Sequence, residues 1–228
     1  MPVIAATPNQ FPFQVLITVN NAEQFQGILI SPEWVLTTAN GLCNKSAVEM
    51  IFGGHSKANL LNSYDTGEVK MSSTNLLIHE NYNSSSLAND VGLIRLPNPL
   101  SLNAGIQPLT RLNRAENLTG QAVKSVGWGL YLESGVLKTT DIPQVVEASI
   151  VDMQVAINAF GQQFNHPGQI AVDTQGGTTR TPTLITSDGQ LVGLGSFGAG
   201  SIGGGPEVYS SIAYFAGWIE QNSGVYFA

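Results

Sequence analysis

The chain contains little charge, although glycine and proline are plentiful. Asp, Glu, Lys and Arg make up only 11% of its 228 residues, while 25 are glycine and 11 are proline. Helices with solvated outer faces need more charge than this, so the composition excludes a helical bundle and favours many short strands joined by turns. With 43% hydrophobic residues, a chain of this length can bury a large core within one all-β domain.

Clusters of basic residues and long apolar runs are also missing. The nine Lys and Arg residues are scattered, and the net charge is −7. Nucleic acids, heparin-like polyanions and acidic membranes attract basic patches, so this charge pattern argues against all three as partners. The weakly charged stretch Leu191–Ile219 is interrupted by glycines and by Pro206, and no apolar run reaches the roughly 18 residues of a membrane helix. We therefore expect no nucleic-acid partner and no membrane partner.

Cysteine and histidine are scarce. The single cysteine, Cys43, excludes a disulfide within the chain, and its thiol is either a small buried apolar group or a bridge to a second molecule. The three histidines, His55, His79 and His166, are 24 and 87 residues apart, which is not the spacing of a metal-ligand cluster. No glycine-rich loop is followed by the lysine and helix of a phosphate site. We expect no metal and no other cofactor.

Three Asn-X-Ser/Thr triplets begin at Asn44, Asn83 and Asn117. Such triplets accept N-linked glycans only in secreted proteins, and in a chain rich in Asn and Ser they also arise by chance. Met1–Ile4 leads directly into a domain-like segment, so we expect no signal peptide in this chain. The triplets alone do not fix the compartment.

The stretch Trp34–Cys43 resembles a catalytic block of the trypsin/chymotrypsin family of serine proteases. In that block Trp-Val-Leu-Thr-Ala-Ala is followed by the general-base histidine and a cysteine, and here Asn40 stands at the histidine. A carboxamide does not ionise near neutral pH and cannot take the proton from a hydroxyl nucleophile. The resemblance therefore implies a protease fold that has lost its general base. In the strand before this block, Gln26 stands where the resemblance would place the disulfide partner of Cys43.

A second match, Leu87–Leu96, resembles the family block Asn-Asp-Ile-Ala-Leu-Ile-x-Leu. Its aspartate orients the catalytic histidine, which implies that Asp90 is the one surviving member of the triad. Without an imidazole to orient, we expect the Asp90 carboxylate to be satisfied by backbone amides or by the Asn40 carboxamide.

The third match, Gly168–Ile185, resembles the nucleophile block Cys-Gln-Gly-Asp-Ser-Gly-Gly-Pro-Leu-Val. Alignment on Gln175 and Gly176 places Thr178 at the serine, whereas alignment on Pro182 requires one inserted residue. The glycines after the family serine let backbone N–H groups turn toward an oxyanion, and other residue types stand there now. The family's Ile-Val-Gly-Gly start would fall just before Met1, so we expect no activation amine in this chain. The resemblance thus implies a degenerate oxyanion and pocket region made by Gly176, Gly177, Thr179, Arg180, Ser196, Phe197 and Gly198.

The resemblance extends from Thr7 to Gln221 and implies an all-β fold of two packed six-stranded antiparallel Greek-key β-barrels with a C-terminal helix. We expect residues 1–228 to form a single unit. Its first barrel would cover residues 10–108, its linker 109–120, its second barrel 121–212 and its helix 213–222.

These features predict a non-catalytic serine protease homologue, not an enzyme, that binds another protein. The resemblance implies an extracellular cofactor, decoy or recognition protein, with innate immunity among the settings, and its partner would be a protease, a receptor or a surface component. One alternative is a weak or altered hydrolase that uses Thr178. Another is an abundant structural or storage protein, suggested by low charge and by many Gly, Asn and Ser residues. The sequence names neither the partner nor the oligomeric state.

Overall fold

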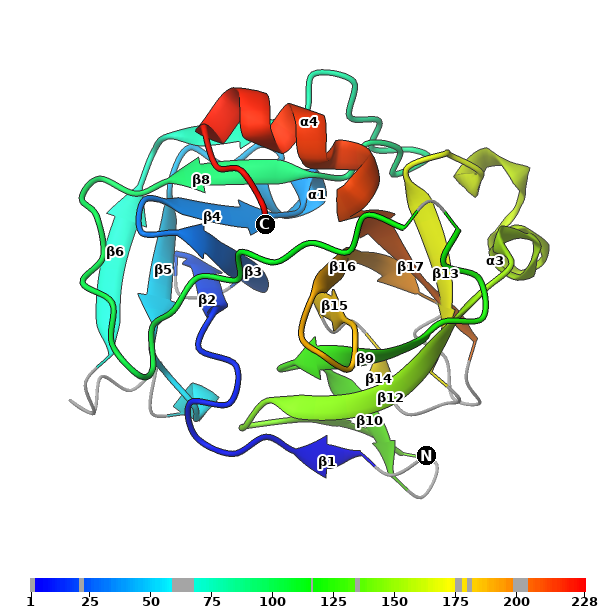
Figure 1. Ribbon diagram of the computed structural model, residues 1–228, viewed down its shortest axis with the longest axis horizontal. Coiled ribbons are helices and arrows are strands. Elements are labelled where there is room, and N and C mark those ends of the chain that lie inside the picture. The colour runs from blue at the N-terminus through cyan, green and yellow to red at the C-terminus, as the bar shows by residue number, and fades with distance from the viewer. Residues whose placement is uncertain are drawn as a thin grey trace.

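The computed structural model describes residues 3–20, 23–58, 68–115, 117–133, 136–174, 178–179, 182–198 and 205–228. Its two halves are β-sheet units that lie side by side, with one helix across the first unit (Figure 1). The predicted all-β, chymotrypsin-like fold with a C-terminal helix is confirmed.

The first unit is a curled antiparallel sheet. Its strands, in spatial order, are β6 (Val69–Ser73), β5 (Val48–Phe52), β2 (Gln14–Val19), β3 (Glu23–Ser31), β4 (Trp34–Thr37), β8 (Gly92–Arg95) and β7 (Leu76–Ile78). Val15 and Ile17 on β2 point to one side and join Leu29, Met50 and other side chains in the core of this unit.

This first sheet is a curled half-barrel and not the closed six-stranded barrel that the resemblance implies, because no ladder joins its edge strands β6 and β7 in the described part of the chain. The two edge strands are consecutive pieces of one bent segment. β6 pairs with β5 and β7 pairs with β8, and only residues 74–75 separate them. At the bend, the Ser73 hydroxyl donates to the Arg95 carbonyl over 2.6 Å and accepts the Asn75 N–H over 3.0 Å. Together with the backbone bond from the Arg95 N–H to the Asn75 carbonyl over 3.0 Å, these side-chain bonds hold the chain where it turns from one edge of the sheet to the other.

The second unit is a closed six-stranded barrel. Its strands run in the order β12 (Gln144–Val151), β13 (Gln169–Asp173), β17 (Pro206–Ser211), β16 (Leu191–Gly198), β15 (Thr183–Ile185) and β9 (Ala122–Gly127), and pairing of β9 with β12 closes the ring. The short strand β1 (Ile4–Ala5) pairs antiparallel with the start of β12. Val123, Ile150, Val172, Leu184 and Val192 fill the barrel interior, as period-two alternation requires.

A small third sheet lies beside the second barrel. It contains β11 (Val136–Thr139), β10 (Leu130–Glu133) and β14 (Thr178–Thr179), in that order. Strand β14 carries Thr178, the residue that alignment with the family's nucleophile block places at the serine.

The helices are few and short. They are α1 (Ala39–Leu42), α3 (Met153–Phe160), the 3-10 turn η1 (Gln162–Phe164) and α4 (Ile212–Ser223). Helix α4 is capped at its start by Ser211, whose side chain accepts the Tyr214 N–H. It is capped at its end by Gly224, whose φ of 71° is the left-handed conformation that glycine adopts most easily. The predicted C-terminal helix is confirmed, with one further residue at each end. In the described part of the chain, none of the helices is long and apolar enough to cross a membrane.

The two units share a continuous apolar interface. One cluster of buried side chains includes Phe13 and Ile28 from the first unit and Val126, Val145 and Leu194 from the second. The connection between the units runs across both of them (Figure 1), and the C-terminal residue is bonded to it through the Thr110 carbonyl. The two units are consequently held firmly together.

Candidate functional site

A cleft of about 600 Å³ lies between the two units. The first unit contributes residues from β3, from α1 and from the turn that contains Lys57. The second unit contributes Trp128, Pro182, the end of β16 and Glu207. A cleft between two rigid units is the usual position of a ligand site.

Asn40 lies in the first turn of α1, beside the cleft. The Thr38 side chain begins the helix by accepting the Gly41 N–H over 3.1 Å. The Asn40 carboxamide oxygen accepts the Tyr82 hydroxyl over 3.2 Å, while the Asn40 backbone N–H donates to Asp90 Oδ1 over 2.7 Å. The structure therefore brings Asn40 and Asp90 together, as predicted, through the backbone of Asn40.

Asp90 is completely buried, and its carboxylate is bonded to neutral donors. The Ser196 hydroxyl donates to Asp90 Oδ2 over 2.5 Å, and the backbone N–H groups of Asn40 and Ala39 also stabilise the charged form. Burial nevertheless raises the pKa of Asp90 above its ordinary value, since these bonds only partly offset desolvation. The sequence left open whether backbone amides or the Asn40 carboxamide would satisfy Asp90. The structure contains the backbone amides, together with the Ser196 hydroxyl. Sequence reasoning missed this use of Ser196.

Tyr82 completes this polar group. Burial is the main reason that its pKa rises to about 12, and the charges of Asp90 and Cys43 add to the effect. Its hydroxyl is consequently protonated at neutral pH and acts as a hydrogen-bond donor to Asn40.

The histidines make contacts of other kinds. The His79 ring stacks on Trp218 with centroids 5.1 Å apart, and Nδ1 of His166 accepts a backbone N–H over 3.0 Å. His55 lies in a turn where its carbonyl accepts the indole N–H of Trp128 over 3.1 Å. The donors to the Asp90 carboxylate are the Ser196 hydroxyl and the backbone N–H groups of Asn40 and Ala39, and none of these three is an imidazole.

The segment aligned with the nucleophile is extended in its described part. Thr178 pairs with Tyr131 and Thr179 pairs with Leu130 in the antiparallel ladder of β14 and β10. Gly176, Gly177 and Arg180 lie outside the described residues. A strand pairing at Thr178 and Thr179 differs from the tight glycine-rich turn that directs two N–H groups at one oxyanion.

The end of β16 forms one wall of the cleft. Pairing with β15 ends at Leu194, whereas pairing with β17 continues to Gly198. One edge of the segment Ser196–Gly198 therefore has no strand partner in the described part of the fold. The Phe197 ring packs on Phe160 and Phe164, with centroids 5.3 Å and 4.8 Å apart, so this wall is anchored to α3 and η1.

Sequence reasoning also missed two charged residues in the cleft. Glu207 is 4% exposed, and its carboxylate lies so close to Gly198 that a Cβ atom at that position would collide with it. The signal was a charge beside the apolar residues Val208 and Tyr209 of β17. Lys57 is half-buried, and burial lowers its pKa although the nearby charge of Asp141 opposes the shift.

Gln26, at the position where the resemblance places the disulfide partner of Cys43, instead bonds to Trp128 in the second unit. Its Nε2 donates to the Trp128 carbonyl over 2.7 Å, and its Oε1 accepts the Trp128 N–H over 2.9 Å. This pair of bonds links the first unit to the second. Cys43 is a free, partly buried thiol, so both of its predicted roles, the apolar group and the intermolecular bridge, stay predictions.

The three predicted glycan acceptors, Asn44, Asn83 and Asn117, are all exposed. Over the described ranges, the structure groups no three His, Cys, Asp or Glu residues in a way that could hold a metal ion.

Two packed antiparallel β-units, a C-terminal helix and an inter-unit cleft beside Asp90 define a protein of the chymotrypsin-like class. The chain belongs to the trypsin family, whose model, described as Trypsin, matches residues 3–219.

Three curated relatives extend over nearly the same length. Brachyurin of Leptuca pugilator is 30% identical over 228 residues, which cover 97% of this chain and 97% of that protein. Serine protease 1 of Rattus norvegicus is 30% identical over 224 residues, covering 92% and 84%. Chymotrypsin of Phaedon cochleariae is 26% identical over 229 residues, covering 95% and 79%. The similarity therefore spans both β-units and the cleft.

Proposed function

We propose that this chain is a non-catalytic member of the trypsin family that acts by binding another protein. The observation that carries the proposal is the environment of Asp90. Asn40 supplies a backbone N–H and a carboxamide that is bonded to Tyr82, and neither can accept a proton from a nucleophile at neutral pH. The polar groups around Asp90 are satisfied without a histidine.

The cleft is the surface that we propose for binding. The edge of Ser196–Gly198 that pairs with no strand among the described residues can add an extended segment of a partner as a further strand, with main-chain hydrogen bonds providing affinity. Because the flanking units share an apolar core, this edge is held in place before the partner arrives and little ordering cost is incurred on binding. The partner is a protease, a receptor or a surface component.

We place this protein in extracellular fluid, as a cofactor, decoy or recognition protein. The family membership and the exposure of the three glycan acceptors support this location. Innate immunity is one setting that the family resemblance suggests.

The binding test uses a matched pair of arginine substitutions. Gln24 is exposed and lines the cleft, whereas Val155 is exposed on α3 and is not among the cleft residues. Wild-type protein would be used to capture partners from the extracellular fluid of its source, and each captured protein would then be titrated against both variants. We expect Gln24→Arg to weaken binding at least tenfold and Val155→Arg to leave it unchanged. Equal binding by both variants would place the interaction outside the cleft. Failure to capture any protein that binds saturably would favour the storage alternative.

The hydrolase alternative has a separate test. A fluorophosphonate probe reacts covalently with an activated hydroxyl, so the folded protein would be incubated with the probe and analysed by mass spectrometry. We expect no labelling of Thr178 under conditions in which trypsin is labelled fully. Labelling at Thr178 would contradict the non-catalytic proposal.

A further inference from the structure

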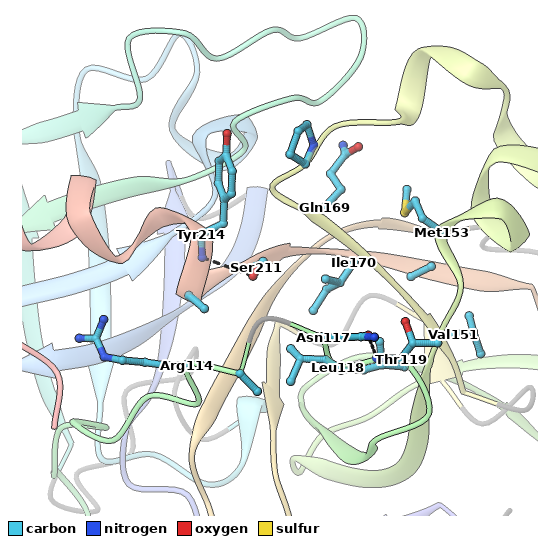
Figure 2. Close-up of a pocket in the computed structure, with 15 residues that line it drawn as sticks. Arg114, Asn117, Leu118, Thr119, Val151, Met153, Gln169, Ile170, Ser211 and Tyr214 are labelled. Carbon is cyan, nitrogen blue, oxygen red and sulfur yellow. Dashed lines mark hydrogen bonds between the residues drawn. The ribbon is translucent and has the colours of Figure 1, made fainter.

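A second hollow, of about 460 Å³, lies outside the closed barrel and shares no lining residue with the cleft. Four segments meet there: the connection around Asn117, the end of β12, the start of β13 and the start of α4 (Figure 2). In Figure 2, Asn117 and Thr119 lie on one side of the hollow, while Tyr214 and Gln169 lie on the other.

The walls of this hollow present apolar and polar surface in similar amounts. Leu118 and Ile150 are buried in its floor, and Met153 stands at its rim. Tyr214 is 53% exposed, with one ring edge packed against Phe215. An exposed tyrosine ring beside apolar side chains suits a ligand that has both apolar faces and hydroxyl groups.

Two of the larger polar side chains in the hollow, Gln169 and Arg114, already have partners. Gln169 accepts the His166 N–H and donates to the carbonyls of Ser86 and Leu87. Arg114 is paired with Glu220 over 2.8 Å. The hollow therefore favours a neutral occupant over an anion.

Asn117 lies at the lip and belongs to the triplet Asn117-Leu118-Thr119. Its Oδ1 accepts the Thr119 N–H over 3.0 Å. This bond orients the carboxamide and leaves Nδ2 as the atom to which a sugar can be attached. Leu118 is buried beneath it, so the triplet is held against the barrel. The other two triplet asparagines, Asn44 and Asn83, line neither the cleft nor this hollow.

We propose that Asn117 carries an N-linked glycan whose first sugars lie in this hollow. Transfer from a lipid-diphosphate-linked oligosaccharide forms a bond between Asn117 Nδ2 and the anomeric carbon of the first N-acetylglucosamine. The bond from that carbon to the diphosphate oxygen breaks, the diphosphate leaves with the electron pair, and Nδ2 loses one proton. The C–H faces of the sugars pack on Tyr214 and Met153, and their hydroxyl groups face water. A catalytic and a non-catalytic chain would carry this glycan alike, so the inference is independent of the proposed binding function and rests only on the proposed extracellular location.

The first experiment establishes the modification. The full chain, placed behind a secretion signal, would be produced in eukaryotic cells and its glycopeptides identified by mass spectrometry. We expect a glycan on Asn117 that is absent from the Thr119→Ala variant. Secreted, folded protein with unmodified Asn117 would overturn the inference.

The second experiment tests the placement of the sugars. A peptide N-glycosidase would release the Asn117 glycan from the native protein, and the rates would be compared among variants. We expect release to be at least about threefold faster in Tyr214→Ala, because its ring contact is lost. Tyr226→Ala is the control, since Tyr226 is 77% exposed and does not line the hollow. Met153→Ala provides a second variant if Tyr214→Ala folds poorly. Equal release rates in wild type and in the folded hollow variants would show that the glycan projects freely into solvent.

Discussion

Replacement of Asp90 by asparagine tests the idea that this buried carboxylate has no cation to stabilise. Asparagine keeps the shape of the side chain. Its Oδ1 can accept the Asn40 N–H, and its Nδ2 can donate to the Ser196 oxygen, so the 2.7 Å and 2.5 Å hydrogen bonds of the wild type each have a counterpart. The change removes a buried charge, whose desolvation costs several kcal/mol and offsets the stronger bonds that a carboxylate makes. We expect Asp90→Asn to change the free energy of unfolding by less than about 1 kcal/mol.

Asp90→Ala is the matched comparison. It leaves the Asn40 N–H and the Ser196 hydroxyl without an acceptor in a buried place, at about 1–3 kcal/mol for each group. We therefore expect this variant to lose about 2–6 kcal/mol. Urea unfolding followed by the fluorescence of the three tryptophans would measure both variants.

The pH dependence gives the sharper result. Burial raises the pKa of Asp90 in the folded state above its pKa in the unfolded state. Protonation of Asp90 therefore contributes stability at pH values below the unfolded-state pKa, and this contribution is lost as the pH rises through the folded-state pKa. Asparagine does not titrate, so the stability of Asp90→Asn relative to wild type should increase between pH 4 and pH 7. A relative decrease over this range, or a loss as large as that of Asp90→Ala, would mean that the charge is stabilised by a cation and would refute the reasoning.

Three further outcomes follow from the same structure. Asn40→His combined with Thr178→Ser should not restore cleavage of a peptide substrate, since the β14 segment is in a strand ladder; measurable turnover, absent from either single variant, would contradict this. Gln26→Ala should destabilise the protein by about 2–3 kcal/mol because it removes two bonds to Trp128 between the units, and urea unfolding would detect the loss. Burial lowers the pKa of His166 in the folded state. The neutral imidazole of His166 therefore contributes stability at pH values above its unfolded-state pKa, and this contribution is lost as the pH falls through the folded-state pKa. His166→Asn, which keeps an acceptor near the position of Nδ1, should therefore lose less stability than wild type between pH 7.5 and pH 5 in the same assay; equal losses would assign the pH dependence to other groups.

Much of the fold was predictable because the relevant signals are local. Strands such as Gln14–Val19 and Trp34–Thr37 are short apolar runs bounded by turn residues, and the resemblance arranged them in the correct class of fold. The proximity of Asn40 and Asp90 followed from the same resemblance.

The bend between β6 and β7 was not predictable in this way. Ser73 and Asn75 have no unusual local signal, and the bend depends on a carbonyl of Arg95 that reaches the site through the packing of β8. A polar side chain holds such a bend only when the tertiary fold places a suitable acceptor beside it.

By itself, the sequence determined the class of fold and the absence of a histidine at Asn40, because residue identity and short-range alternation carry that information. Only the tertiary structure decided which groups surround the buried Asp90 carboxylate, since Ser196 comes from a strand 106 residues away. The same holds for Glu207 in the cleft and for the hollow beside Asn117. Each of these depends on how segments distant in the chain pack together, and the balance of burial, hydrogen bonding and charge exists only once they meet.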